Sequence, residues 1–469
     1  MSLALAALAL AATPLNFESC RIGAADGITM PAECATLEVA ENRADPGGRR
    51  ITLSIAKVAA FRGSSLPPLV FIAGGPGQSA LESFPQVAAA FREVRKTRDI
   101  LLVDQRGTGG SNPLQCAPLQ DAEMTMDFDA AQARSEAARC AESLDADLRF
   151  YTTLDAVQDL EEVRAALGAE QLALYGISYG TRVAQEYLRR HPERVEKIIL
   201  DGVVAAGEAL GPRIGADAQA ALEIMFERCA ADTECAARFP DLRRRFSALR
   251  ARLERKPVTV EIRDPFTFET AEITLNWLRV AGLLRMYSYL PESVALLPLL
   301  LHQAETGDWQ ALAGSVLTLE RQNENLLYIG MHNSVVCSED APFLAAATEE
   351  PGYLGTVMTE FIAAMCEAWP QRELPKDMRE PVVSDVPALL LSGEADPVTP
   401  PRNAEQVAEH LANSLHLVAP GQGHGVAWRG CAPRLVADFL ADGIEVLDAS
   451  CLDELRAYPF FIDANGPTP

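Results

Sequence analysis

Positive charge is scarce in this sequence of 469 residues. Its 41 Lys and Arg residues stand against 65 Asp and Glu residues, which gives a formal net charge of −24 at pH 7. A surface of this sign repels phosphate backbones and anionic lipids, so it argues against nucleic-acid binding and membrane-surface binding. It favours cationic substrates such as peptides with a free amino terminus, although an acidic surface also serves solubility alone.

Long hydrophobic runs, metal motifs and cofactor motifs are also lacking. Beyond the N-terminus no uncharged apolar stretch reaches the roughly 18 residues of a membrane-spanning helix, so no stable membrane insertion is expected. There is no CxxC pair, no Cys/His metal spacing, no HExxH and no P-loop. The glycine-rich stretches 107–110 and 421–425 lack the following helix or the glycine spacing of a dinucleotide-binding turn. We therefore expect no metal and no cofactor.

The ten cysteines are an even number, and they fall as near neighbours along the chain. Without metal spacing, such a set is typical of disulfides formed in an oxidising compartment. Sequential pairing is the simplest arrangement, although spacing alone does not determine connectivity, and free buried cysteines are the alternative. The expected pairs are Cys20–Cys34, Cys116–Cys140, Cys229–Cys235, Cys337–Cys366 and Cys431–Cys451.

Residues 1–12 form an Ala- and Leu-rich segment of the kind found in secretory signal peptides. The usual Lys or Arg start is missing, and the segment is too short to span a bilayer. A buried first helix is the alternative. Together with the cysteines, the segment predicts a secreted or periplasmic location.

Short apolar runs that end in Gly or Asp alternate with helical patterns over residues 13–204. In residues 155–167, for example, Val and Leu recur on one helical face. Buried strands that alternate with helices predict an α/β fold with a mostly parallel sheet. The strand-like runs occupy residues 51–60, 68–73, 100–104, 171–175 and 197–201.

The pattern becomes helical over residues 205–380, where only 257–262 has the pattern of an extended segment. Strand-like runs return in residues 381–469. We therefore expect a large helical lid, 205–380, inserted between two parts of the core, 13–204 and 381–469. Active sites of open α/β sheets lie at the carboxyl ends of the strands, where such an insertion would cover them.

A glycine-bracketed serine follows one of the predicted strands. The segment Gly176-Ile177-Ser178-Tyr179-Gly180 lies between the apolar run 171–175 and a helical pattern over 181–190. This is the context of the nucleophile elbow G-x-S-x-G, whose turn is too tight for side chains beside the serine. The helix N-terminus favours the negative charge that develops there. We predict Ser178 as the nucleophile of a serine hydrolase.

An acid and then a histidine follow such a serine along the chain. Asp396 comes directly after a predicted strand, and Glu394 is the competing acid. His424 lies in the glycine-rich loop 421–425 after the next strand, whereas the other five histidines lie in patterned elements. We predict His424 as general base, with Asp396 fixing its tautomer. The Ser–Asp–His order at three strand ends predicts an α/β-hydrolase fold.

An oxyanion hole needs two backbone N–H donors. The amide of Tyr179 is one by construction of the elbow. The second is expected from the loop Gly74–Gln78, whose glycines allow a close approach to a substrate carbonyl. We favour the amide of Gly75.

The core carries five motifs: GGPGQ at 74–78, DQRGTGGSNP at 104–113, GISYGTRVA at 176–184, GEADPVTP at 393–400 and GQGHG at 421–425. Together they resemble the secreted tripeptidyl aminopeptidases, relatives of the proline iminopeptidases within the α/β-hydrolases. The lid resembles this family only loosely, in its helical texture and in residues 335–340. Cytosolic proline iminopeptidases usually carry histidine where Ala73 stands, which favours the secreted branch. The resemblance implies exopeptidase action at a free amino terminus, or esterase activity in some members.

An aminopeptidase must also bind the ammonium group of its substrate, which requires a carboxylate near the elbow. Glu339 and Asp340, close to Cys337, are the candidates. The alternative is that they only begin a helix beside a disulfide. Asp104 and Arg106 are expected to brace a loop by a salt bridge rather than touch the substrate.

We expect a secreted serine aminopeptidase that cleaves short peptides from free N-termini through an acyl-enzyme. A carboxylesterase with the same triad is the alternative among enzymes. A non-catalytic hydrolase-fold binding protein is the alternative from another class, but such proteins usually lose a triad member, and all three residues are present here. The expected partner is a peptide with a free N-terminus, and no nucleic acid.

Overall fold

The computed structural model describes residues 14–24, 27–116, 129–323, 326–346 and 352–467. The signal-peptide-like segment 1–12 lies outside the described residues.

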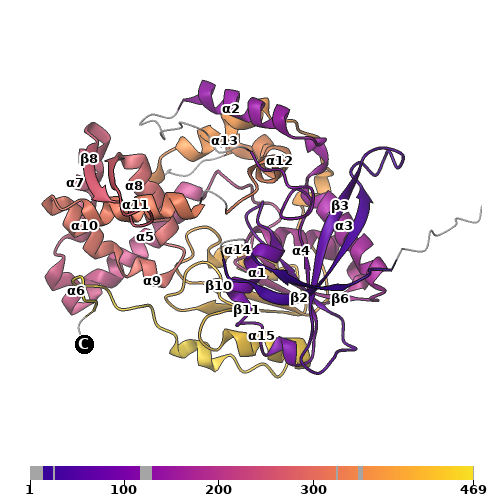
Figure 1. Ribbon diagram of the computed structural model, residues 1–469. Helices are drawn as coiled ribbons and strands as arrows, with labels where there is room; N and C mark the ends of the chain where they lie inside the picture. The colour runs from indigo at the N-terminus through magenta and orange to yellow at the C-terminus, as the bar shows by residue number, and fades with distance from the viewer. Residues whose placement is uncertain (1–13, 25–26, 117–128, 324–325, 347–351, 468–469) are drawn as a thin grey trace, which may run out of the picture.

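A nine-stranded mixed sheet forms the centre of the protein (Figure 1). The strand order is β1-β2-β3-β5-β4-β6-β7-β10-β11. The first three strands and β5 pair antiparallel, and all neighbours from β5 to β11 pair parallel. The strands are β1 (Glu18–Ile22), β2 (Met30–Ala40), β3 (Arg50–Val58), β4 (Leu69–Ile72), β5 (Ile100–Val103), β6 (Leu172–Ile177), β7 (Val195–Asp201), β10 (Ala388–Gly393) and β11 (Ser414–Ala419).

The predicted strand-like runs correspond to β3 to β7, β10 and β11, so the mostly parallel sheet is confirmed. The sequence did not indicate β1 and β2, which form the antiparallel edge. Many of their side chains are exposed or half-buried, and such strands carry no continuous apolar run.

Helices cover both faces of the sheet. Successive side chains of β6 point to opposite faces, as they must in a strand. Leu172 and Leu174 pack in one hydrophobic cluster with α3 and α4, whereas Ala173 and Tyr175 pack in another with α1 and α15. The helices are α1 (Ala80–Val87), α3 (Thr153–Leu167), α4 (Tyr179–Arg190) and α15 (Ala432–Asp442); α2 (Ala130–Ser143) and α14 (Pro401–Ala408) complete the core.

Between β7 and β10 the described residues form nine α-helices and one β-hairpin. Helices α5 to α11 and the hairpin pack around a second hydrophobic cluster, whereas α12 and α13 pack in the cluster that also contains α3 and α4. Figure 1 shows α5 to α11 grouped on one side of the sheet, with α12 and α13 above it. The predicted extended segment 257–262 becomes β8, and its partner β9 was not foreseen. The elements are α5 (Ile214–Ala231), α6 (Thr233–Arg238), α7 (Leu242–Arg255), β8 (Val258–Arg263), β9 (Thr270–Leu275), α8 (Trp277–Tyr287), α9 (Pro291–Val294), α10 (Leu297–Thr306), α11 (Gln310–Asn323), α12 (Ile329–Glu339) and α13 (Val357–Ala368).

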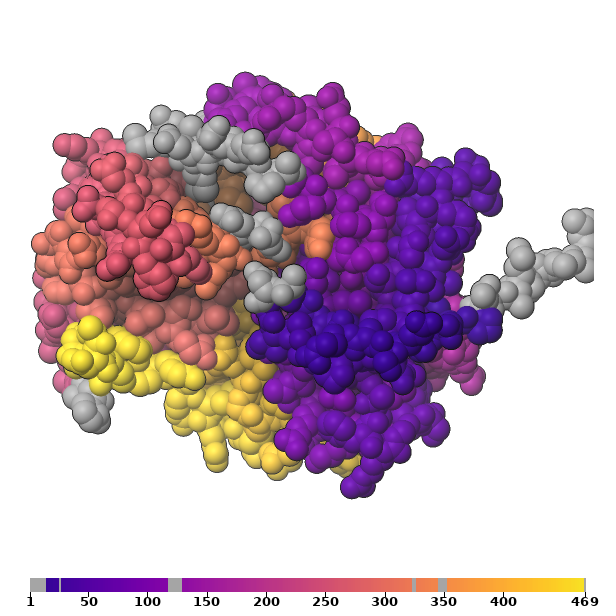
Figure 2. Space-filling view, in the orientation of Figure 1, coloured from indigo at the N-terminus to yellow at the C-terminus, as the bar shows by residue number. Residues whose placement is uncertain are grey.

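The C-terminal residues return to this helical region. Phe460 packs in its hydrophobic cluster, and the amide of Phe461 donates to the carbonyl of Ala295 at 3.0 Å. Arg228 of α5 donates to the carbonyl of Tyr458 at 3.0 Å. Figure 2 shows part of the C-terminal segment, in yellow, against the red and orange atoms of this helical region. The last part of the chain therefore contributes to both the sheet and the helical region.

All ten cysteines form disulfides, and the sequential pairing is confirmed. Cys337–Cys366 joins α12 to α13, and Cys431–Cys451 ties the start of α15 to the C-terminal segment. Within the described part of the chain, no helix is both long and apolar enough to cross a membrane.

Candidate active site

Ser178 stands in a sharp turn between β6 and α4. Its backbone has φ 55° and ψ −127°, a conformation that costs energy for any residue with a side chain. A Cβ atom on Gly176 would lie 2.4 Å from the carbonyl oxygen of Gly180, and one on Gly180 would lie 2.3 Å from that of Ile72. Both flanking positions therefore require glycine, which is the physical reason for the glycine bracket in the sequence.

Asp396 and His424 follow β10 and β11, and the structure brings their side chains together. Nδ1 of His424 lies 2.8 Å from Oδ2 of Asp396. Oδ1 of Asp396 accepts the amides of Val398 and Thr399, each at 2.9 Å. The carboxylate is buried, so all its strong contacts come from the protein.

The electrostatics of this pair favour the charged forms. Burial by itself would raise the pKa of Asp396, but His424 and the two backbone amides lower the pKa below its ordinary value. Burial would lower the pKa of His424, but the negative charge of Asp396 raises it above the ordinary 6.5. An imidazolium formed at this position is thus stabilised.

The residues at the end of β7 connect the elbow with the histidine. The amide of Ser178 donates to the carbonyl of Asp201 at 2.9 Å. A Cβ atom on Gly202 would lie 3.0 Å from Cε1 of His424. Ser178, Asp396 and His424 therefore gather at the carboxyl edge of neighbouring strands, where the active sites of open α/β sheets lie.

The predicted oxyanion-hole residues border the nucleophile. Tyr179 is the first residue of α4, and the first amides of a helix have no acceptor within the helix. Gly75 follows β4 with φ 104°, a region that favours glycine. Its neighbour Gly74 is so close to the elbow that a Cβ atom there would lie 3.0 Å from Cβ of Ser178. The loop can approach a substrate carbonyl at Ser178 only because these positions lack side chains.

Asp104 and Arg106 brace loops, but with separate partners, so the expected salt bridge between them is not formed. Asp104 accepts the hydroxyl of Ser79 at 2.6 Å and the amide of Leu81 at 3.0 Å, just beyond the glycine loop. Burial raises the pKa of Asp104 to about 6. Arg106 forms a bidentate pair with Asp159, with both distances 2.7 Å. Each group is buried, and each has hydrogen-bond partners within the protein.

Glu339 and Asp340 lie together at the end of α12, buried, and both contact Arg182 of α4. Arg182 donates to Asp340 Oδ1 at 3.0 Å and lies 3.3 Å from Glu339 Oε2. Glu339 also accepts the amide and the hydroxyl of Thr153, at 2.7 and 2.9 Å. That hydroxyl lies 2.8 Å from the phenol oxygen of Tyr179. Burial raises the pKa of Glu339 to about 7, although Arg182 acts in the opposite direction.

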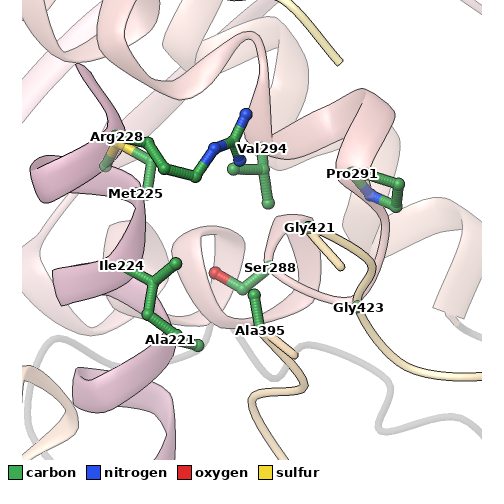
Figure 3. Close-up of a pocket in the computed structure, with 10 residues that line it drawn as sticks. All are labelled: Ala221, Ile224, Met225, Arg228, Ser288, Pro291, Val294, Ala395, Gly421 and Gly423. Carbon is green, nitrogen blue, oxygen red and sulfur yellow. The ribbon is translucent and has the colours of Figure 1, made fainter. Parts of the chain in front are cut away.

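The helical region contacts the histidine loop directly. The amide of His424 donates to the carbonyl of Tyr289, the second residue after α8, at 2.8 Å. Figure 3 shows a small cavity where α5 and the α8–α9 turn meet the loops of Asp396 and His424. Its lining includes Ala395 and Gly423, the residues next to Asp396 and His424. The helical region therefore packs against the loops that carry Asp396 and His424.

Sequence reasoning missed two side chains at this site. Thr399 donates its hydroxyl to Asp396 Oδ2 at 2.8 Å, and the same hydroxyl lies 3.1 Å from Nδ1 of His424. Asp201 binds the main chain just after His424. The sequence could have pointed to Asp201, because it ends the apolar run 197–201. An aspartate at the end of a strand is common in other roles as well, so its position alone did not single it out. Among the described residues, no group of three or more His, Cys, Asp and Glu side chains could hold a metal ion.

Comparison with known proteins establishes the family. Residues 67–430 match the alpha/beta hydrolase fold family, and the chain belongs to it. The α/β-hydrolase fold predicted from the Ser–Asp–His order is thereby confirmed.

Three relatives illustrate the range of similarity. A tripeptidyl aminopeptidase of Streptomyces lividans is 30% identical over 219 residues, which are 43% of this chain and 40% of that protein. A serine protease of Mycobacterium tuberculosis is 29% identical over 208 residues, 41% of this chain and 40% of that protein. A putative hydrolase of Escherichia coli is 24% identical over 405 residues, 82% of this chain and 79% of that protein. The resemblance to tripeptidyl aminopeptidases is confirmed, and the chain spans 40% of the length of the Streptomyces enzyme.

Proposed function

We propose that this protein is a serine aminopeptidase that cleaves short peptides from free N-termini. The observation that carries the proposal is the contact between His424 and Asp396 beside the strained elbow of Ser178. The similarity to a tripeptidyl aminopeptidase over part of the core supports peptides as the substrate class.

In the proposed mechanism, the hydroxyl oxygen of Ser178 attacks the scissile carbonyl carbon while His424 accepts the hydroxyl proton. The amides of Tyr179 and Gly75 stabilise the oxyanion. His424 then gives the proton to the leaving amine as the carbon–nitrogen bond breaks, which leaves an acyl-enzyme. Water hydrolyses the acyl-enzyme with His424 again as base, and Ser178 recovers its proton. Asp396 keeps the imidazole in the required tautomer throughout.

The helical region between β7 and β10 acts in this proposal as the lid, residues 205–380, that limits substrates to chain ends. The hydrogen bond from the amide of His424 to the carbonyl of Tyr289 supports this role, because a movement of the lid at Tyr289 would also move the histidine loop. Closed sites favour substrates that enter with a terminus first.

Glu339 and Asp340 are proposed to bind the substrate ammonium. Both carboxylates contact the guanidinium of Arg182, and the positive charge of Arg379 also acts on both. Burial is the main cause of the raised pKa of Glu339, and the negative charge of Asp340 adds to it. In this proposal a substrate ammonium pairs with these carboxylates and stabilises the ionised form of Glu339.

We also propose that the protein works in an oxidising compartment, either outside the cell or in the periplasm. The five disulfides support this location, because such bonds do not persist in a reducing cytosol.

The test of the proposed activity is a product profile from a peptide library. Each peptide is offered with a free and with an acetylated N-terminus, beside a short-chain ester. Release of short N-terminal peptides from the free-amine series alone is the expected result. Rapid ester hydrolysis with no peptide cleavage would assign the protein to the carboxylesterases instead. No turnover and no labelling of Ser178 by a fluorophosphonate would leave only a binding role.

A further inference from the structure

Asp201 is a buried carboxylate beside the triad that the mechanism above does not use. It ends β7, which lies in the sheet between the strand of the nucleophile, β6, and the strand of the acid, β10. Its exposed fraction is 0%. Burial of an isolated charge raises the free energy of the folded state, so a buried carboxylate at this place needs hydrogen-bond or charge partners.

The contacts of this carboxylate are all with hydrogen-bond donors. Its Oδ1 accepts the amide of Val426 at 2.8 Å, and its Oδ2 accepts the amide of Ala427 at 2.9 Å. Oδ2 also accepts the hydroxyl of Tyr175 at 2.8 Å. A protonated acid would have to donate one hydrogen bond, whereas an ionised one only accepts. Burial raises the pKa of Asp201 above its ordinary value, and the hydrogen bonds from Ala427, Val426 and Tyr175 act in the opposite direction. The arrangement of donors therefore fits the anion.

These contacts hold the main chain directly after the catalytic histidine. Val426 and Ala427 follow His424 by two and three residues, so the loop that carries the imidazole is tied to the end of β7. The main-chain carbonyl of Asp201 in turn accepts the amide of Ser178. One residue thus contacts both the elbow and the histidine loop.

We propose that Asp201 is a positioning residue that anchors the loop of His424 and places a second fixed negative charge close to its imidazole. Within the described part of the chain, the charges that act on the imidazole are those of Asp396 after β10, Asp201 at the end of β7, and Arg285 of α8. Burial lowers the pKa of His424, the two acids raise it, and Arg285 lowers it. Asp201 would thus help to stabilise the imidazolium that forms when His424 takes the proton of Ser178.

This role rests on the proposed triad, but it holds for peptide and ester substrates alike. The test is therefore made with a small activated ester, p-nitrophenyl acetate, and rates are expressed per site titrated with a fluorophosphonate. Asp201→Asn keeps the size of the side chain and removes its charge. We expect kcat/KM to fall about 10²-fold, the effect of a small misplacement of catalytic groups. We expect the acidic limb of the pH profile of kcat/KM to move to lower pH, because His424 loses a favourable charge.

Asp104→Asn is the matched control. Asp104 is equally buried and also accepts backbone amides, but it braces the loop after β4 rather than the histidine loop. Whatever rate this variant retains, its acidic limb is expected to stay where it is in the wild type. A purely structural effect of losing a buried carboxylate would leave the limb in place in both variants.

The proposal is overturned if Asp201→Asn keeps the wild-type acidic limb, or if its kcat/KM stays within about twofold of the wild type. If Asp201→Asn does not fold, Asp201→Glu retains the charge and displaces the loop. Its kcat/KM should fall while the acidic limb stays, and a limb that moves would contradict the proposed charge effect. Failure of the triad itself would be recognised separately, since Ser178→Ala would then remain active on the same ester.

Discussion

Oδ2 of Asp396 is shared between His424 and Thr399, at 2.8 Å from Nδ1 of the one and 2.8 Å from the hydroxyl of the other. Oδ1 is held by two backbone amides, so the carboxylate has no freedom to turn away. Such a carboxylate fixes the imidazole with Nε2 left for the nucleophile.

Asp396→Asn should therefore cost about 10⁴ in kcat, because an amide in this place favours the wrong tautomer of His424. The measurement is steady-state hydrolysis of the preferred peptide at the optimal pH, with unfolding temperature as the check on structure.

Glu394→Gln is the control for the choice of acid. Glu394 is exposed, and its carboxylate accepts the amide of Gly421 at 2.7 Å rather than contacting His424. We expect a loss of less than about tenfold, the equivalent of one modest hydrogen bond. A larger loss from Glu394→Gln than from Asp396→Asn would reverse the assignment.

Ser178→Ala should abolish turnover, with a loss on the order of 10⁶ in kcat, because no other group supplies the attacking oxygen. The fold should persist, since alanine fills the same place in the elbow with fewer atoms. Circular dichroism and thermal unfolding check the fold, and fluorophosphonate labelling checks the nucleophile. Activity above a few per cent of the wild type, or labelling of the variant, would contradict the assignment.

Reduction of the disulfides should destabilise the protein. Each bridge constrains the unfolded chain and contributes about 2–4 kcal/mol to the free energy of unfolding, although strain and residual structure modify this. We expect a lower unfolding temperature in a thiol reductant. Mass spectrometry of denatured, alkylated protein prepared without reductant should find few free thiols. Ten alkylated cysteines in protein exported by its native host would refute both the bonds and the compartment.

Glu339→Gln and Asp340→Asn distinguish an ammonium site from a structural cluster. If the pair binds substrate, each variant should raise KM for free-amine peptides, by about 10- to 150-fold for a lost charge-assisted hydrogen bond of about 1.5–3 kcal/mol. Hydrolysis of a small uncharged ester should hardly change. Equal losses on peptide and ester would assign the pair a structural role, in which it supports α4 through Arg182 and α3 through Thr153. No loss on either substrate would place the ammonium site elsewhere.

The sequence was most informative where chemistry forces a local pattern. A side chain at Gly176 or Gly180 would collide with backbone oxygens of the elbow, so both positions require glycine. The sequence shows this requirement as a serine with a glycine two residues before it and another two residues after it. The buried parallel strands appeared as apolar runs because both of their faces are covered. The antiparallel edge of β1 and β2 did not appear, since half-exposed strands carry a weaker pattern.

The sequence by itself indicated the strand ends at which Ser178, Asp396 and His424 lie, the parallel part of the sheet, and the even set of cysteines, because each depends on residue type and short-range spacing. Only the tertiary structure decided the partners of the buried charges. Arg106 forms an ion pair with Asp159, and Arg182 forms ion pairs with Glu339 and Asp340. The carboxylate of Asp201 accepts hydrogen bonds from the backbone amides after His424. These pairings join segments that are between 53 and 226 residues apart. Nothing in the local sequence specifies such partners; they follow from which strand ends and helices the packed core places within hydrogen-bonding distance.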